Sequence, residues 1–267
     1  MPVPPSPEPF APVPADAGSR AAFRRYRSID GFVLRGVATL LLYTCASGAA
    51  AQFSGTLTAV SDYRYRGITF SDGKPAAQGG VTYDDPTGWY AGAFGSTVRF
   101  SPSGGSSANL QAIVYAGYAA RLPSGVSLEA GGDYSVFAGS SDLNYGEVFV
   151  GGATENLNAR IYYSPRYFGQ SSNAIYGEIN ASQPLIDRVR LHLHVGLLRY
   201  RYDDPYGPRY GPQSAQNIVD GRIGLRFDLD LLQVEVAWVG VSNHGAAYPI
   251  TGSTSSNSVV ASVSLPF

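Results

Sequence analysis

The sequence predicts an all-β protein, namely a transmembrane antiparallel β-barrel of about twelve strands. Three observations predict this fold. From Phe53 onward, apolar and polar residues alternate with a period of two in segments bounded by Gly, Pro, Asp or Ser. The connections between segments alternate between short and long, and the last segment ends on an aromatic residue, Phe267. Short periplasmic turns and longer outer loops are typical of outer-membrane barrels.

The composition favours short strands over long helices. The 267 residues include 32 glycines, 19 tyrosines and a single methionine, with 15% charged residues. The mean hydropathy of −0.06 is near neutral, as expected where lipid-facing and lumen-facing residues alternate and cancel. After the N-terminal region no apolar window of about 18 residues suits a membrane helix. The net charge of −1 excludes a strongly basic nucleic-acid binder, so we expect no nucleic-acid partner.

The N-terminal region has the pattern of an export signal. A proline-rich stretch, residues 1–18, predicts a disordered leader. Arginines at 24, 25 and 27 precede the apolar stretch 36–46, and small residues at 47–51 follow, which predicts a signal peptide cleaved between Ala51 and Gln52. The alternative, a short membrane anchor, is disfavoured because the apolar run is too short to span. The predicted division is therefore leader and signal over 1–51 and barrel over 52–267.

The final segment has the clearest alternation. One face is apolar and the other carries Ser258, Ser262 and Ser264. We expect the apolar face to contact lipid and to carry the signal for the outer-membrane assembly machinery; its residues are Val259, Ala261, Val263, Leu265 and Phe267.

The first segment shows the same alternation, and the sequence predicts one strand over residues 53–66. On this interpretation Tyr63 and Tyr65 face lipid, while Asp62, Arg64 and Arg66 face the lumen.

Ten further strands are expected between these two. Their ranges are near 75–83, 88–100, 107–121, 126–137, 142–153, 157–164, 174–182, 189–201, 217–228 and 232–243. The expected periplasmic turns, at 84–88, 122–125, 154–156, 183–187 and 229–231, are all short, whereas the connections 201–216 and 244–257 are the longest. An even strand number and alternating connection lengths suit a barrel with both termini in the periplasm. A soluble β-sandwich, the alternative, does not require that alternation.

Aromatic residues at strand ends suggest two interfacial girdles. The predicted periplasmic girdle contains Tyr83, Tyr90 and Phe267, and the predicted outer girdle contains Tyr63, Tyr65, Phe100 and Tyr134. Ordinary strand propensity is the alternative explanation for these positions.

The stretch Ser61-Asp-Tyr-Arg-Tyr-Arg-Gly67, followed by residues 71–76 and by Gln78-Gly79, resembles the opening motif of the TorF-like porin family. Weaker blocks at Tyr90-x-Gly92 with Ser96, at 162–165 with 167–169, and at Pro184-Leu185 extend the resemblance over most of the mature chain. The resemblance implies an outer-membrane barrel and a pore, without an established substrate. Residues before Arg24 are not part of it.

Charged and imidazole side chains are expected to line the lumen, because lipid excludes them. The predicted pore-lining residues are Asp62, Arg64, Arg66, Arg99, Glu129, Asp133, Glu147, Arg160, Glu178, Arg190, His192, His194, Asp220, Arg222, Arg226 and Glu235, and Arg166 was assigned to the lumen with them. Most arginines fall on the first, ninth and tenth predicted strands, and three acidic residues fall on the fifth and sixth. One hypothesis is a transverse field that orients solutes; the alternative is structural ion pairs that brace the lumen.

The function predicted from this arrangement is a narrow passive pore for ions or small solutes, with outer-membrane lipid and the assembly machinery as partners. Twelve strands lie between the eight that side chains can fill and the sixteen to eighteen of wide channels. The loop 202–212 was expected to fold over or into the mouth. A non-conducting structural or interaction barrel is the alternative.

No cofactor, metal or catalytic site is predicted. His192 and His194 share a face but lack a third ligand, and the adjacent Asp203 and Asp204 supply too few oxygens for calcium. A barrel enzyme that acts on lipid needs a serine and a histidine on the outer face, for which His244 is the only candidate.

Overall fold

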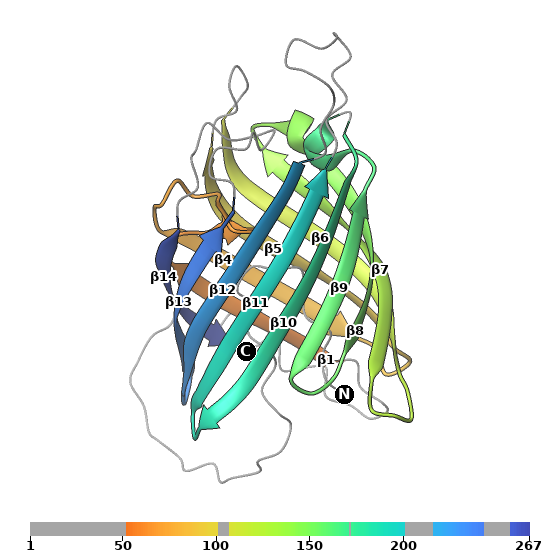
Figure 1. Ribbon diagram of the computed structural model, residues 1–267, viewed down its shortest axis with the longest axis vertical. Helices are drawn as coiled ribbons and strands as arrows, with labels where there is room; N and C mark the ends of the chain where they lie inside the picture. The colour runs from red at the N-terminus through yellow and green to blue at the C-terminus, as the bar shows by residue number, and fades with distance from the viewer. Residues whose placement is uncertain (1–51, 101–106, 171, 201–215, 243–256) are drawn as a thin grey trace, which may run out of the picture.

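The computed structural model describes residues 52–100, 107–170, 172–200, 216–242 and 257–267. It contains a closed barrel of twelve antiparallel strands, tilted against the barrel axis (Figure 1). The barrel strands are β1 (Gln52–Val60), β4 (Ala76–Asp84), β5 (Trp89–Phe100), β6 (Ala108–Arg121), β7 (Ser127–Ala138), β8 (Tyr145–Ala153), β9 (Leu157–Ser164), β10 (Ala174–Ile186), β11 (Val189–Tyr200), β12 (Gln216–Leu229), β13 (Leu232–Val241) and β14 (Ser258–Pro266). No helix in these ranges is long and apolar enough to cross a bilayer.

Each strand pairs with its neighbours in sequence, and β1 closes the barrel against β14. The predicted strand number and antiparallel order are therefore confirmed. Four of the five periplasmic turns lie where predicted within two residues; the turn after β10 is shorter, because β10 continues through a register shift to Ile186. The outer connections are longer, as the alternation required.

The outer surface is an apolar band, which makes the barrel a transmembrane one. On β14, Val259 is 66% exposed and Val263 is 44% exposed, whereas Ser262 and Ser264 are buried in the interior. The same alternation runs through β9, β11 and β12, where exposed leucine, isoleucine and valine side chains alternate with buried ones. An apolar band on the outside suits contact with lipid, and polar residues on the inside suit contact with a polar lumen.

The last residue of the chain extends the pairing between β1 and β14 that closes the barrel wall. Gly55 and Phe267 exchange two backbone hydrogen bonds of 2.9 Å. A Cβ added at Gly55 would lie 2.5 Å from the Phe267 ring and 3.0 Å from the Gly80 carbonyl oxygen. The ring therefore covers a strand position that has no side chain, as aromatic rings cover glycine in other sheets.

We expect Gly55→Ala to lower the free energy of unfolding by about 1–3 kcal/mol, because the methyl group forces the Phe267 ring away. Gly177→Ala is the matched control, since a Cβ at this β10 glycine meets nothing within 4 Å. Urea unfolding of the refolded barrel in lipid vesicles measures both changes. Equal stability of the two variants would show that the ring does not hold the closing strands together.

The first predicted strand is wrong beyond Val60. There the chain leaves the wall and turns into the barrel, where β2 (Arg64–Tyr65) and β3 (Ile68–Thr69) form a small antiparallel hairpin. Residues 61–75, called the inner hairpin below, include side chains that are buried from Asp62 to Ser71. Both alternating sets of the predicted strand thus lie inside, because the barrel surrounds the inner hairpin.

The two aromatic girdles are partly wrong as well. Tyr63 is fully buried and Tyr65 is 4% exposed, since both belong to the inner hairpin. Tyr90 is 5% exposed and faces the lumen, where its hydroxyl donates to Glu129 at 2.8 Å. Phe267 and Tyr134 are on the outside, 65% and 47% exposed. Tyr83 is half-buried against the ring of Phe53, with centroids 5.0 Å apart, and the side chain of Phe100 lies outside the described residues.

Candidate pore lumen

The inner hairpin is held in shape by one buried carboxylate. Asp62 accepts hydrogen bonds from Arg64 Nε at 2.7 Å, Thr69 Oγ1 at 2.5 Å and Ser71 Oγ at 3.1 Å. The backbone N–H of Phe70 donates to the Tyr63 carbonyl at 2.7 Å and closes the base of the inner hairpin. Asp62 is 4% exposed, and a buried carboxylate is tolerated only when it is paired and hydrogen-bonded in this way.

An aromatic cluster, made of Tyr63, Phe70, Phe137, Tyr145 and Phe168, packs the inner hairpin against the half of the barrel that contains the 3-10 helix η2 (Tyr167–Gly169). The Phe70 ring lies 5.6 Å from the Tyr63 ring, 6.3 Å from Phe137 on β7 and 6.1 Å from Phe168. Phe168 belongs to η2 and also lies 4.6 Å from Tyr145 on β8. These rings fill that side of the lumen with close-packed apolar surface.

The tip of the inner hairpin forms an ion pair with the opposite wall. Arg66 Nη2 lies 2.6 Å from Glu147 Oε2 on β8, and both side chains are at most 5% exposed. Arg66 also donates to the Tyr167 hydroxyl at 3.1 Å, and the Tyr65 hydroxyl donates to Glu147 at 3.3 Å. The guanidinium therefore joins β8 to the inner hairpin through charge-assisted hydrogen bonds.

A second buried ion pair spans β8 along the wall. Arg160 on β9 lies 2.7 Å from Glu129 on β7, with side chains 2% and 7% exposed. The strand between them carries Gly151, whose added Cβ would lie 2.8 Å from Glu129 Oε1 and 3.2 Å from Arg160 Cγ. The two side chains meet because this position of β8 has no side chain.

The wall made by β10 to β13 carries the two predicted histidines. His192 Nδ1 lies 3.1 Å from Glu235, which also pairs with Arg222. His194 Nε2 lies 2.6 Å from Asp220, and its Nδ1 lies 2.6 Å from the Asn180 side-chain oxygen. The histidines thus bind different carboxylates. No group of three His, Cys, Asp or Glu with metal-site geometry occurs in the described residues.

The structure turns most of the predicted pore-lining residues inward. Buried in the interior are Asp62, Arg64, Arg66, Glu147, Arg160, Glu178, Asp220, Arg226 and Glu235, and partly exposed there are Glu129, Asp133, Arg190, His192, His194 and Arg222.

Arg99 is wrong as a lumen residue. It is exposed near the end of β5, within the register shift between Thr97 and Phe100, and does not line the cavity described below. Arg166 is exposed on an outer connection. His244, Asp203, Asp204 and the loop 202–212 lie outside the described residues.

The ion pairs distinguish between the two explanations for the lumen charges, a transverse field and structural ion pairs. Arg64, Arg66, Arg160 and Arg222 each bind a carboxylate, in the pairs Arg64–Asp62, Arg66–Glu147, Arg160–Glu129 and Arg222–Glu235. The charges of the first and sixth predicted strands are therefore joined rather than held on opposite walls. Ion pairs that brace the lumen account for these residues.

The sequence pattern did not single out the lumen aromatics. Tyr162 on β9 and Tyr176 on β10 are 3% and 2% exposed, beside the charged pairs. The sequence contained a signal for both, since Tyr162 lies two residues from Arg160 and Tyr176 two residues from Glu178, so each shares the strand face of a charged residue.

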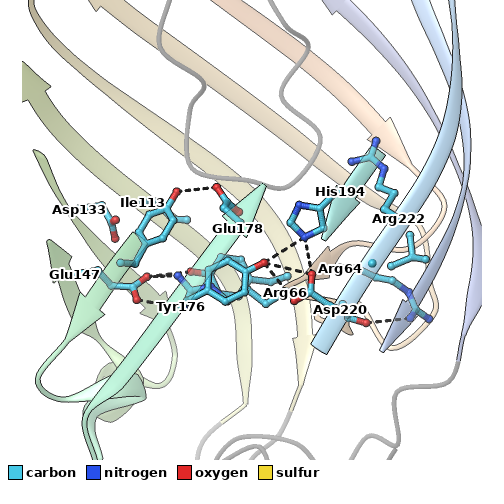
Figure 2. A pocket seen from close by; sticks show the side chains of 15 residues that line it. Arg64, Arg66, Ile113, Asp133, Glu147, Tyr176, Glu178, His194, Asp220 and Arg222 are labelled. Carbon is cyan, nitrogen blue, oxygen red and sulfur yellow. Dashed lines mark hydrogen bonds and ion pairs between the residues drawn. The ribbon is translucent and has the colours of Figure 1, made fainter. Parts of the chain in front are cut away.

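A cavity remains between the inner hairpin and this wall. It has about 610 Å³ of space not filled by atoms, some of it open to solvent, and Arg66, Glu147, Tyr162, Tyr176, His194 and Asp220 are among its lining residues. Figure 2 shows Arg66, Glu147, Tyr176, His194 and Asp220 around this space, with Tyr176, His194 and Asp220 joined by hydrogen bonds. The interior is thus packed with aromatic rings on one side and bordered by charged and polar side chains on the other.

A family model described as "Bacterial protein of unknown function (Gcw_chp)" matches residues 44–266. The chain belongs to this family. Membership states no activity, and the narrower resemblance to TorF-like porins stays a prediction. A comparison with curated proteins found no match.

Solved structures that match this chain include two porins and an outer-membrane channel. A NanC porin shares 12% identity at a TM-score of 0.50, covering 81% of this chain and 99% of its own. A KdgM porin shares 11% identity at a TM-score of 0.45, covering 80% and 98%. The channel DcaP of Acinetobacter baumannii shares 10% identity at 0.41, covering 83% and 99%. At 12% identity the NanC match bears on the fold alone.

Proposed function

We propose that the chain is a narrow passive pore of the bacterial outer membrane, permeable to ions or small polar solutes. The observation that carries the proposal is the polar side of the lumen. His192, His194 and Arg222 have side chains 15%, 14% and 12% exposed, and Arg190 is 33% exposed. These inward-facing arginine and imidazole groups contact solvent within an apolar shell, as in a water-filled barrel.

Export and assembly are part of the proposal. Cleavage after Ala51 would release a chain that begins at Gln52, the first residue of β1. The apolar face of β14, which ends at Phe267, is the segment that we assign to the assembly machinery.

A non-conducting structural barrel is the second candidate, because the inner hairpin and its aromatic cluster fill one side of the lumen. Recordings of the refolded protein in planar bilayers decide between the two. We expect discrete conductance steps, together with swelling of liposomes in small amino acids and sugars. Folded protein that inserts into bilayers without conductance steps would contradict the pore and leave the structural barrel.

A further inference from the structure

The guanidinium group of Arg66 lies in a cage of aromatic rings. Its Cζ atom is 4.2 Å from the Tyr176 ring centroid, 4.9 Å from Tyr65, 5.3 Å from Tyr162 and 5.4 Å from Tyr167. Distances within about 6 Å of a ring face give favourable cation–π interaction, and arginine is the side chain most often found there. The cage is completed by Glu147, which accepts from both terminal nitrogens of Arg66, at 3.2 and 2.6 Å.

The cage belongs mainly to the wall and not to the inner hairpin. Glu147 is on β8, Tyr162 on β9, Tyr176 on β10 and Tyr167 in η2; only Tyr65 comes from the inner hairpin. Tyr162 donates to Glu178 at 3.2 Å and Tyr176 donates to Asp220 at 3.2 Å, so their hydroxyls are fixed independently of Arg66. Two of the four rings are therefore held in place by the wall, and the inner hairpin adds the Tyr65 ring together with the planar cation of Arg66.

Arg66 is an unusual residue for its backbone position. Arg66 and Gly67 form a two-residue turn between the paired residues Tyr65 and Ile68, with φ values of +49° and +79°. Turns of this kind favour Asn-Gly, Asp-Gly or Gly-Gly, because an ordinary side chain is strained at positive φ. A strained arginine at the tip is explained by what its side chain binds.

The cavity beside the cage is lined by charged groups of both signs. Asp133, Glu147, Glu178 and Asp220 line it together with Arg64, Arg66 and Arg222. The cage therefore lies next to a space that polar and charged side chains border.

From these observations we propose that the cage of Glu147, Tyr65, Tyr162, Tyr167 and Tyr176 is a guanidinium-binding site, and that Arg66 occupies it as a tethered ligand. A solute that carries a guanidinium group and enters the cavity competes with Arg66 for the same rings and carboxylate. The planar fork of a guanidinium matches a carboxylate in a way that a compact ammonium does not. This inference concerns binding; that such solutes reach the cage by passing through the lumen rests on the proposed pore.

The test is calorimetric titration of the refolded full-length barrel in detergent with ethylguanidinium, and with ethylammonium as the comparison cation. Arg66→Gly removes the tethered cation and suits the turn. A tethered ligand acts at an effective concentration in the ~mM range, so we expect Arg66→Gly to bind ethylguanidinium at least about tenfold more tightly than the wild type. Binding of ethylammonium to the variant should be weaker than binding of ethylguanidinium.

Two further variants make the result specific. The double variant Arg66→Gly with Glu147→Gln should lose the gained affinity, because the carboxylate is gone. Arg188→Gly, in an exposed periplasmic turn, should bind as the wild type does. If Arg66→Gly does not fold, Arg66→Gln, which keeps a shorter polar side chain without the charge, takes its place in the same titration.

The proposal is overturned if neither Arg66 variant binds ethylguanidinium more tightly than the wild type, or if ethylammonium binds equally well. The titration needs no conductance. Tighter binding of ethylguanidinium without conductance steps would reject the pore and keep the site. Conductance steps without tighter binding would reject the site and keep the pore.

Discussion

Glu129→Leu is expected to destabilise the barrel by about 3–5 kcal/mol, because it removes the carboxylate that lies 2.7 Å from the buried Arg160 guanidinium. The Arg160 side chain is 2% exposed, and its Cζ lies 4.6 Å from the Phe149 ring centroid. It also donates to the Tyr162 hydroxyl at 3.0 Å, which in turn donates to Glu178 at 3.2 Å. Urea unfolding in lipid vesicles measures the loss.

A double-mutant cycle separates the pair from its surroundings. Arg160→Leu added to Glu129→Leu should recover most of the lost stability, because replacing both charges by apolar groups removes the unpaired cation. The control is the exposed pair of Arg188 and Asp230, 3.2 Å apart with side chains 61% and 85% exposed. Asp230→Asn should change stability by at most about 1 kcal/mol. A loss below that value for Glu129→Leu would mean that water reaches Arg160.

Phe70→Ala is expected to undock the inner hairpin. The ring is fully buried and contacts other rings of the aromatic cluster, as well as the Tyr65 ring at 5.2 Å. Removing a buried phenylalanine ring lowers the free energy of unfolding by about 3–5 kcal/mol. Here the loss weakens the contact between the inner hairpin and the wall. If the chain conducts as proposed, single-channel recordings should show a larger and noisier conductance than the wild type.

Phe53→Ala is the matched control for this change, because Phe53 is 70% exposed on the outer face of β1. It should leave the conductance unchanged. Wild-type conductance and stability in Phe70→Ala would show that the inner hairpin stays in place without this ring.

The wall of the barrel was predictable from the sequence because lipid imposes a strict alternation on each strand. The strand from Leu157 to Ser164 was predicted with both ends correct, since Asn156 and Pro165 flank it. The inner hairpin was not predictable in the same way. Alternation continues through Tyr63, Arg64 and Tyr65, but a segment surrounded by the barrel has no lipid face, so the pattern no longer tells which side a residue occupies.

The lumen was predicted better for charges than for rings. Charged side chains are excluded from lipid, so assigning Glu147 and Arg160 to the interior needed only their position on a strand. Tyrosine is accepted both at the membrane interface and in a packed lumen, which is why Tyr90 was placed outside. The lumen position predicted for Arg99 is wrong because charge alone does not predict it: Arg99 is exposed, whereas Ser96 and Val98 on the same strand are buried.

The contact of Gly55 with Phe267 also bears on the order in which the barrel assembles. The other strand pairs join neighbours in sequence, whereas Thr58 and Ser264 at the closing pair are 206 residues apart. Closing the longest loop carries the largest loss of chain entropy, and distant contacts form slowly. We therefore expect this contact to form last during folding and to open first under denaturant, so that Phe267 reports on when the barrel becomes complete.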